Sequence, residues 1–350
     1  MLVNKFVFFI VLVLGNVIEI CAQHDTTFYQ QYPQKLVVTL YQSVARENII
    51  SISQDRIADK NGLTSLRFAS QAKNFTGIAF DYDIFGLSIG VNTFPSQDTY
   101  KKGTSKNTTI AFSFGTNKLA FETSYRNFKG FYDRNTENYT IGFGPNSPYF
   151  RIPSMQFVGL KFKMMYYANH RKFSYKSAYA STHRQLKSAW SPVFSVGAYY
   201  NNLSTDSTFF PKQIAPFYSV DRGLTEIGVK GISSGGGASG NLIFLKDFFL
   251  NATILLALES QWRNYEYVDK AKNNGIHFAF GGDLRTSLGY NSERFMCFFS
   301  FLYDFSKWNS QSVNFNNQYL SGQLNLTYRF NVKKPKWYHI IEDNWIYKLF

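Results

Sequence analysis

The side chains best suited to acid–base chemistry in this sequence are His277, Asp283, Arg285 and Glu259. His277, Asp283 and Arg285 stand at alternate positions of one segment, so they would share one face of a β-strand. Residues two apart on such a face lie about 7 Å apart, which separates His277 from Asp283 by about 20 Å. A direct dyad is therefore excluded, and catalysis at His277 would need a nucleophile or metal ion within hydrogen-bond reach. No Cys or His cluster has the spacing of metal ligands, so we predict no catalytic residue, metal or cofactor.

Two overlapping glycine-rich motifs resemble enzyme signatures. Gly231-Ile232-Ser233-Ser234-Gly235 fits the nucleophile elbow G-x-S-x-G, and Gly235-Gly236-Gly237-Ala238-Ser239-Gly240 fits the dinucleotide pattern G-x-G-x-x-G. The first works at a strand-to-helix turn over a parallel sheet, and the second needs a helix N-terminus that receives a pyrophosphate. Neither a helix nor an α/β pattern follows here. We therefore interpret both motifs as a glycine-rich strand, and a hydrolase is only a minor alternative.

The elements that must position these residues are β-strands with two different faces. From Ile276 to Tyr290 the even positions are mostly apolar and the odd positions mostly polar or small, and Tyr319 to Phe330 repeats this alternation. A period of two residues is typical of a strand with one apolar and one polar face. Many such strands in a chain with an export signal indicate a membrane β-barrel whose apolar face meets lipid.

Strand candidates recur along the chain, joined by alternating short turns and long loops. They are Leu36 to Ser43, Ile49 to Ser53, Ser65 to Ser70, Thr76 to Tyr82, Phe85 to Thr93, Thr108 to Gly115, Leu119 to Phe128, Phe157 to Tyr167, Phe173 to Ser181, Val193 to Tyr200, a glycine-rich strand within Leu224 to Leu245, Phe248 to Trp262, Ile276 to Tyr290, Arg294 to Phe305 and Tyr319 to Val332. We predict an all-β fold, an antiparallel transmembrane β-barrel of about 12 strands, within a range of about 10 to 14.

One turn conflicts with the expected arrangement of the strands. In such barrels the short turns all lie on the periplasmic side. The short turn expected at Asn169 would then lie on the opposite side from the turns near Lys246 and Asn291. A missing or split strand in the glycine-rich region would remove the conflict.

Charged side chains on the polar faces are expected to point into the barrel, because a charge facing lipid costs about 2 to 4 kcal/mol at the midplane. The candidate lumen-lining residues are Glu122, Arg126, Lys161, Lys163, Glu259, Arg263, Asp283, Arg285, Asp304 and Arg329. Unpaired buried charges are unfavourable, so opposite charges should pair across strands, among them Glu259, Arg263, Asp283, Arg285 and Arg329. Bulky pairs in a barrel of about 12 strands would leave little free bore.

The first 22 residues have the three-part form of a secretory signal peptide. Lys5 precedes an apolar run from Phe6 to Ile18, and small residues near Cys21 and Ala22 suit cleavage after Ala22. A lipoprotein signal would place a small residue just before the cysteine, where Ile20 stands. We expect Cys21 to be removed with the signal, which leaves Cys297 alone on an apolar strand face, so neither a disulfide nor a zinc framework is expected.

Composition agrees with an exported barrel and bears on its partners. Mean hydropathy is only −0.23 although 19% of the 350 residues are aromatic, because polar lumen residues alternate with apolar ones. The formal net charge is +14, but the Lys and Arg residues form no basic helix or patch interleaved with aromatics, so nucleic acid is not expected. We expect the anionic groups of outer-membrane lipid and lipopolysaccharide to be the partners of this positive charge.

The chain divides into three expected parts: the signal peptide 1–22, the barrel domain 23–332 and a C-terminal periplasmic tail 333–350. The tail is rich in Trp, Tyr and Ile, which suits an amphipathic segment at the interface. It could also plug the lumen, and the tail or the loops could engage a protein partner.

Several segments resemble a Bacteroidota family of exported proteins known as domain of unknown function 4421. The segments are Asn169-His170-Arg171-Lys172-Phe173-Ser174-Tyr175, Gln185-Leu186-Lys187-Ser188-Ala189, Asp25-Thr26-Thr27-Phe28-Tyr29 with Tyr32-Pro33 and Lys35-Leu36, and Phe244-Leu245-Lys246-Asp247-Phe248-Phe249-Leu250. Trp190 departs from the small residue, usually Gly, that the family carries after Ser188-Ala189. The resemblance implies an outer-membrane barrel of a Gram-negative bacterium and supplies no activity or catalytic residues.

Two functions of different classes follow from a charge-filled barrel. In one, the protein is a structural or interaction component whose lumen is closed by ion pairs. In the other, it is a channel that transports or binds a small polar solute. The bulky charges of both signs favour the first function.

Overall fold

The structure, a computed structural model, describes residues 24–53, 65–71, 73–93, 98–269, 272–310, 313–336 and 338–343. The predicted signal peptide and the last seven residues of the predicted tail lie outside this part of the chain. The strands are β1 (Tyr29–Gln31), β2 (Lys35–Ser53), β3 (Ser65–Ser70), β4 (Lys73–Tyr82), β5 (Phe85–Asn92), β6 (Lys106–Gly115), β7 (Leu119–Asp133), β8 (Arg151–Tyr167), β9 (His183–Gln185), β10 (Ala189–Ser204), β11 (Leu224–Phe244), β12 (Phe248–Tyr267), β13 (Lys272–Asn291), β14 (Phe295–Asn309) and β15 (Val313–Asn331). The helical turns are α3 (Thr99–Lys102), η1 (Thr136–Asn138), α4 (Lys176–Tyr179), η2 (Ala215–Gly223) and α5 (Tyr338–Glu342).

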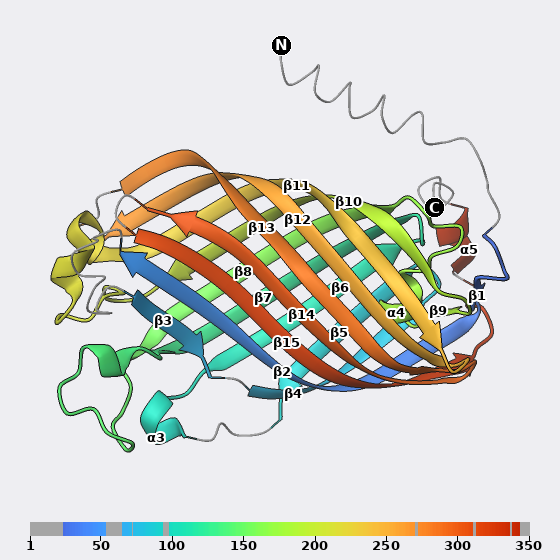
Figure 1. Cartoon of the computed structure of the whole chain (residues 1–350), viewed down its shortest axis with the longest axis horizontal. Coiled ribbons are helices and arrows are strands. Elements are labelled where there is room, and N and C mark those ends of the chain that lie inside the picture. The colour runs from blue at the N-terminus through green and yellow to red at the C-terminus, as the bar shows by residue number, and fades with distance from the viewer. Residues whose placement is uncertain are drawn as a thin grey trace, which may run out of the picture.

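A 13-stranded antiparallel sheet closes on itself as a barrel (Figure 1). β15 pairs with β2 from Val313 opposite Ser53 to Asn331 opposite Lys35, so no strand edge is left open there. Twelve strands form the ring, namely β2, β4 to β8 and β10 to β15. The prediction of an antiparallel barrel of about 12 strands is confirmed.

The outer surface of the barrel is apolar over most of the strand length. On β12, Ile254, Leu256 and Leu258 are 54 to 61% exposed, whereas the flanking Thr253 and Glu259 are buried. An apolar exterior with a polar interior is stable where lipid, rather than water, surrounds the wall. The closed sheet with this apolar exterior is a membrane-spanning barrel.

No helix among the described residues is long and apolar enough to cross a membrane.

The polarity of the strands reverses near the barrel end that carries the long loops. There Phe157 of β8, Leu203 of β10 and Trp308 of β14 are fully buried inside, and polar residues such as Gln156 and Asn202 alternate with them. Phe209, Ile214 and Tyr218 of the β10–β11 loop pack on these side chains. We call this cluster the apolar core, and we call this end extracellular, because long loops face outward in such barrels.

The wall changes its number of strands along its height. β3 and β4 follow each other along the same edge of β2, since Ala69 of β3 opposes Asn48 and Lys73 of β4 opposes Ala45. β3 also pairs directly with β7, whereas the β5–β6 hairpin separates β4 from β7. Toward the extracellular end, β3 therefore stands in place of β4, β5 and β6.

Residues 168 to 188, between β8 and β10, fold into the opposite, periplasmic end as a plug. The predicted strand from Phe173 to Ser181 is wrong: Phe173 is fully buried, and α4 follows it. β9 of the plug pairs with β1 near the start of the described chain. This insertion removes the conflict over the turn at Asn169, because β8 ends and β10 begins at the same end of the barrel. The glycine-rich region does not supply a missing strand, since β11 is one strand of 21 residues.

Candidate functional site

A chamber of about 350 Å³ lies inside the barrel, bordered by the plug on its periplasmic side. One wall carries small side chains from the short strands, among them Ala79, Gly86, Ser88, Ala111 and Ser113. Tyr41 of β2 lies over this wall, and its ring occupies the space that a side chain at position 77 would need, since a Cβ built on Gly77 would lie 2.1 Å from Tyr41. The small residues thus leave the space that the chamber occupies.

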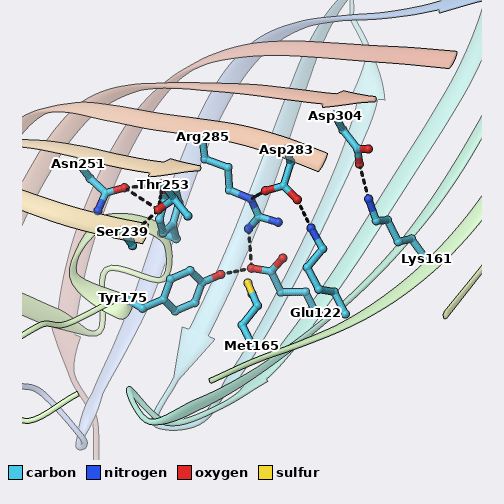
Figure 2. A network of polar contacts seen from close by, with 12 residues as sticks. Glu122, Lys161, Met165, Tyr175, Ser239, Asn251, Thr253, Asp283, Arg285 and Asp304 are labelled. Atoms are coloured by element: carbon cyan, nitrogen blue, oxygen red, sulfur yellow. Dashed lines mark hydrogen bonds and ion pairs between the residues drawn. The ribbon is translucent and has the colours of Figure 1, made fainter. Parts of the chain in front are cut away.

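The charged side chains of the chamber form ion pairs that cross the bore (Figure 2). Nη1 of Arg285 on β13 lies 2.8 Å from Oε1 of Glu122 on β7. Asp283 accepts a hydrogen bond from Nε of Arg285 at 3.1 Å and forms a second ion pair with Lys163 of β8. β7 lies five strands from β13 in one direction around the twelve-stranded ring and seven in the other, so the Arg285–Glu122 pair ties together two walls that lie nearly opposite each other.

A second group of ion pairs lies beside the first. Lys161 of β8 donates to Oδ2 of Asp304 on β14 at 2.8 Å. Arg126 of β7 lies 3.7 Å from Asp304 and 3.6 Å from the fully buried Glu47 of β2, and its guanidinium stacks 4.4 Å above the Tyr319 ring. We call the two groups together the ion-pair network. Glu47 was missed in the sequence because it lies in the gap between two predicted strands that are one strand, β2.

Glu259 and Arg263 are buried but take no part in this network. Glu259 accepts hydrogen bonds from Tyr199 at 2.6 Å and from Ser306 at 2.7 Å, and Arg263 donates to Gln261 at 2.7 Å. Their expected pairing with Asp283, Arg285 and Arg329 is wrong. The β12–β13 register is the cause, because it places Ala279 opposite Glu259 and Leu255 opposite Asp283.

Arg329, at the periplasmic end of β15, holds the plug rather than an acidic partner. Arg329 is 1% exposed, and its guanidinium donates to the carbonyl oxygens of Ser181 at 2.6 Å and of His183 at 3.2 Å. It also donates to Oδ1 of Asn291 at 2.8 Å and lies 4.8 Å above the ring of Tyr32. A charged donor shared among carbonyl groups fixes the plug backbone without closing an ion pair.

Other polar side chains of the wall hold the plug in the same way. Asn241 of β11 donates to the carbonyl of Ser174 at 2.9 Å and to Oε1 of Gln185 at 3.0 Å. Tyr175 of the plug hydrogen-bonds Glu122, so the plug also contacts the ion-pair network (Figure 2). Alternating aromatic residues made this segment resemble a strand, but here the rings face the barrel interior.

Lys176 of the plug borders the chamber and carries a titratable ammonium group. Its ammonium donates to the carbonyl oxygen of Asp83 at 2.8 Å. Burial lowers the pKa of Lys176 to about 8, although nearby Asp83 and Asp81 act in the opposite direction. Burial likewise holds the pKa of His183 well below its usual value, with Lys176 and Arg329 adding to the effect.

The residues suited to acid–base chemistry lie apart from one another. In the β12–β13 register His277 opposes Gln261, whereas Asp283 and Arg285 belong to the ion-pair network. The two glycine-rich motifs lie within β11, as predicted. Gly235 and Gly237 allow close approach of β12 there, since a Cβ on Gly237 would lie 1.8 Å from the carbonyl oxygen of Ile254.

Comparison with solved structures finds proteins of low identity that cover most of this chain. The outer membrane protease OmpT of Escherichia coli is 10% identical, with a TM-score of 0.37 over 86% of this chain and 98% of its own. A bacterial polysaccharide outer membrane secretin is 8% identical, with a TM-score of 0.35 over 85% and 99%. The toluene transporter TodX of P. putida is 9% identical, with a TM-score of 0.28 over 86% and 91%. At these values the likenesses carry no argument about activity.

No curated protein matches the sequence. A family described as a domain of unknown function (DUF4421) matches residues 23–330. The match covers the plug and the barrel as far as Phe330 of β15, including the segments that resemble this family. The chain belongs to this family, DUF4421.

Proposed function

We propose that the protein is a closed, non-conducting barrel that serves the outer membrane as a structural or interaction component. The observation that carries this proposal is that side chains fill the bore at three levels. The plug occupies the periplasmic end, the ion-pair network crosses the middle, and the apolar core fills the extracellular end. A continuous aqueous path would require all three to rearrange.

The contacts within each level support a lasting closure. Removing one partner of a buried ion pair typically costs about 3 to 5 kcal/mol, so the charges resist separation. The plug adds hydrogen bonds from Arg329 and Asn241 to its backbone, and its removal would leave these groups unsatisfied. The acidic and basic side chains of the chamber bind one another, which favours a non-catalytic role.

The chamber itself favours a second candidate, a binding or transport site for a small polar solute. A volume of about 350 Å³ lies at the lower end of the usual range for ligand pockets. Lys161 is 23% exposed beside Asp304, so charged groups are accessible to a guest. A solute that entered the chamber from the periplasm would meet Lys176 and Tyr179 of the plug, which border it.

Planar-bilayer recording of the purified full-length protein distinguishes the two functions. We expect little or no steady conductance for the unchanged protein. Arg329→Ala, which releases two plug carbonyls, should raise the frequency of openings, whereas the lipid-facing control Leu326→Ala should not. Large steady channels in the unchanged protein would overturn the closed-barrel proposal and favour the solute channel.

A further inference from the structure

Two lysines on the outside of the barrel face each other directly across neighbouring strands. Lys106 of β6 opposes Lys129 of β7, and both side chains are exposed. Like charges directly opposite each other destabilise a sheet. Neither lysine has an acidic partner among the described residues. We call these two residues the lysine pair.

The wall below the lysine pair changes from polar to apolar within two residue pairs. Thr108 opposes Asn127, which accepts a hydrogen bond from Gln156 of β8 at 2.8 Å. The next pair is Ile110 opposite Tyr125, beside Leu160 of β8, and Ile110 and Leu160 are 39% and 48% exposed. The lysine pair thus stands four residues, or about 13 Å along the strands, above the apolar belt.

This position corresponds to the headgroup region of the outer leaflet. The polar layers add about 5 to 8 Å on each side of a hydrocarbon core about 30 Å thick. With strands tilted by about 35 to 45°, a distance of about 13 Å along a strand rises about 10 Å, so the edge of the hydrocarbon core lies between Ile110 and the lysine pair. Lipid phosphate groups lie at that height, and water-exposed loops begin just beyond it.

Further positive charge lies beyond the lysine pair toward the extracellular end, where Arg151 opposes Tyr132, three residues after Lys129 on β7. The α3 turn is fixed beside the start of β8, because Tyr149 donates to the carbonyl of Lys101 at 3.0 Å and Arg151 donates to that of Tyr100 at 3.3 Å. Asp98, in the same turn, is paired with Lys102 at 3.1 Å. Lys101 and Arg151 therefore add to the positive charge of this side of the barrel.

We propose that β6, β7, β8 and the α3 turn bind the phosphate-bearing headgroup of an outer-leaflet glycolipid of the lipid A type. The phosphate bridges Lys106 and Lys129 and relieves their repulsion, since ammonium groups bind phosphate through charge-assisted hydrogen bonds. Thr108, Asn127 and Gln156 face the sugar, and the acyl chains lie on Ile110 and Leu160. The height of the pair favours an outer-leaflet glycolipid over a phospholipid of the inner leaflet.

The experiment measures lipid binding to the purified full-length barrel in detergent by native mass spectrometry. The probes are bisphosphorylated lipid A, the same lipid without phosphates, and phosphatidylglycerol. Lys106→Ala combined with Lys129→Ala should weaken binding of bisphosphorylated lipid A about tenfold or more. The control combines Lys230→Ala with Lys307→Ala, two exposed lysines on β11 and β14, which removes the same charge at positions three or more strands away from the lysine pair.

Three results would overturn the proposal. They are equal losses in the two double variants, equal binding of lipid A with and without phosphates, and equally tight binding of phosphatidylglycerol at the lysine pair. Altered gel mobility on heating, which reports an intact barrel, shows that each variant is folded. The result does not depend on whether the lumen conducts.

Discussion

The membrane-spanning and extracellular parts of the same strands are built with opposite polarity. On β8, the lumen side carries Lys161 and Lys163 where lipid surrounds the barrel, and Met155 and Phe157 near the extracellular end. The outward side changes in the reverse direction, from Leu160 to Gln156. One continuous strand therefore meets two solvents, and the side chains that face outward follow whichever solvent lies there.

The difference teaches that the two parts are held together by different forces. Water outside the extracellular part drives apolar side chains inward, and each fully buried one contributes about 1.5 to 3 kcal/mol. Lipid outside the membrane part gives no such drive, because the tails are as apolar as the side chains. There the interior is organised by ion pairs and hydrogen bonds instead. Mutations should therefore affect the two parts through different mechanisms.

The largest effect is expected in the apolar core. Trp308 is fully buried and lies 6.1 Å from the ring of Phe157, so Trp308→Ala should lower the free energy of unfolding by about 3 to 5 kcal/mol. Phe299→Ala on the same strand is the control, since Phe299 is 51% exposed to lipid and leaves no cavity. Urea titration of the protein folded in lipid vesicles measures both. Equal losses would mean that water does not surround the extracellular part.

A comparable effect is expected in the ion-pair network. Asp283→Ala leaves Lys163 and Arg285 without this carboxylate and should destabilise the barrel by about 3 to 5 kcal/mol. Adding Lys163→Met should restore part of the loss, because it removes one of the unpaired charges. A double-mutant cycle by urea titration measures the coupling. Additive effects would indicate that the network does not hold the walls together.

Adjacent residues of β15 test which face meets lipid. Leu324 is 53% exposed on the outside, and Gln323 lines the chamber. Leu324→Lys should lower stability by about 2 to 4 kcal/mol, whereas Gln323→Lys should be tolerated. Comparing the two folded fractions in vesicles gives the answer. If Gln323→Lys were the more harmful substitution, the assignment of faces would be reversed.

The smallest effect on stability is expected in the plug, at Lys176. The pKa of Lys176 is lowered to about 8 in the folded protein. Above that pH the unfolded chain, in which the pKa of lysine is ordinary, therefore keeps a proton on Lys176 that the folded protein loses. The free energy of unfolding should therefore rise as the pH goes from about 8 to 10.5, the ordinary pKa of lysine. Lys176 contributes at most one proton to the slope of this rise. Lys176→Met should remove that part of the slope, which a difference between the two pH profiles reveals. Parallel profiles would show that Lys176 keeps its ordinary pKa.

The alternation of apolar and polar residues predicted the fold, and the strands from Ile276 to Tyr290 and from Tyr319 to Phe330 lie within β13 and β15. The plug could not be predicted in this way. Phe173, Tyr175 and Tyr179 stand at odd positions as in a lipid-facing strand, and only the surrounding wall shows that they face inward.

The sequence also could not predict which charged residues form ion pairs with one another. The pairing of Asp283 depends on the β12–β13 register, because a shift of a few residues changes which side chains meet. Contacts across the bore, such as Arg285 with Glu122, depend on how the ring closes. The reversal of polarity toward the extracellular end could not be predicted either. A period of two residues shows that a strand has two different faces, but not which face points outward.

The β5–β6 hairpin extends over only part of the barrel's height, so the barrel is wider at its periplasmic end than at its extracellular end. Circumference follows strand number, so the hairpin widens only the periplasmic mouth and leaves the extracellular end narrow. Ser105 closes the seam above the hairpin, where its hydroxyl donates to the carbonyl of Gly130 at 2.7 Å and accepts from the amide of Gln71 at 2.9 Å. The added strands thus give the inserted plug its room at the periplasmic end and leave the strands that carry the extracellular loops in a narrower ring.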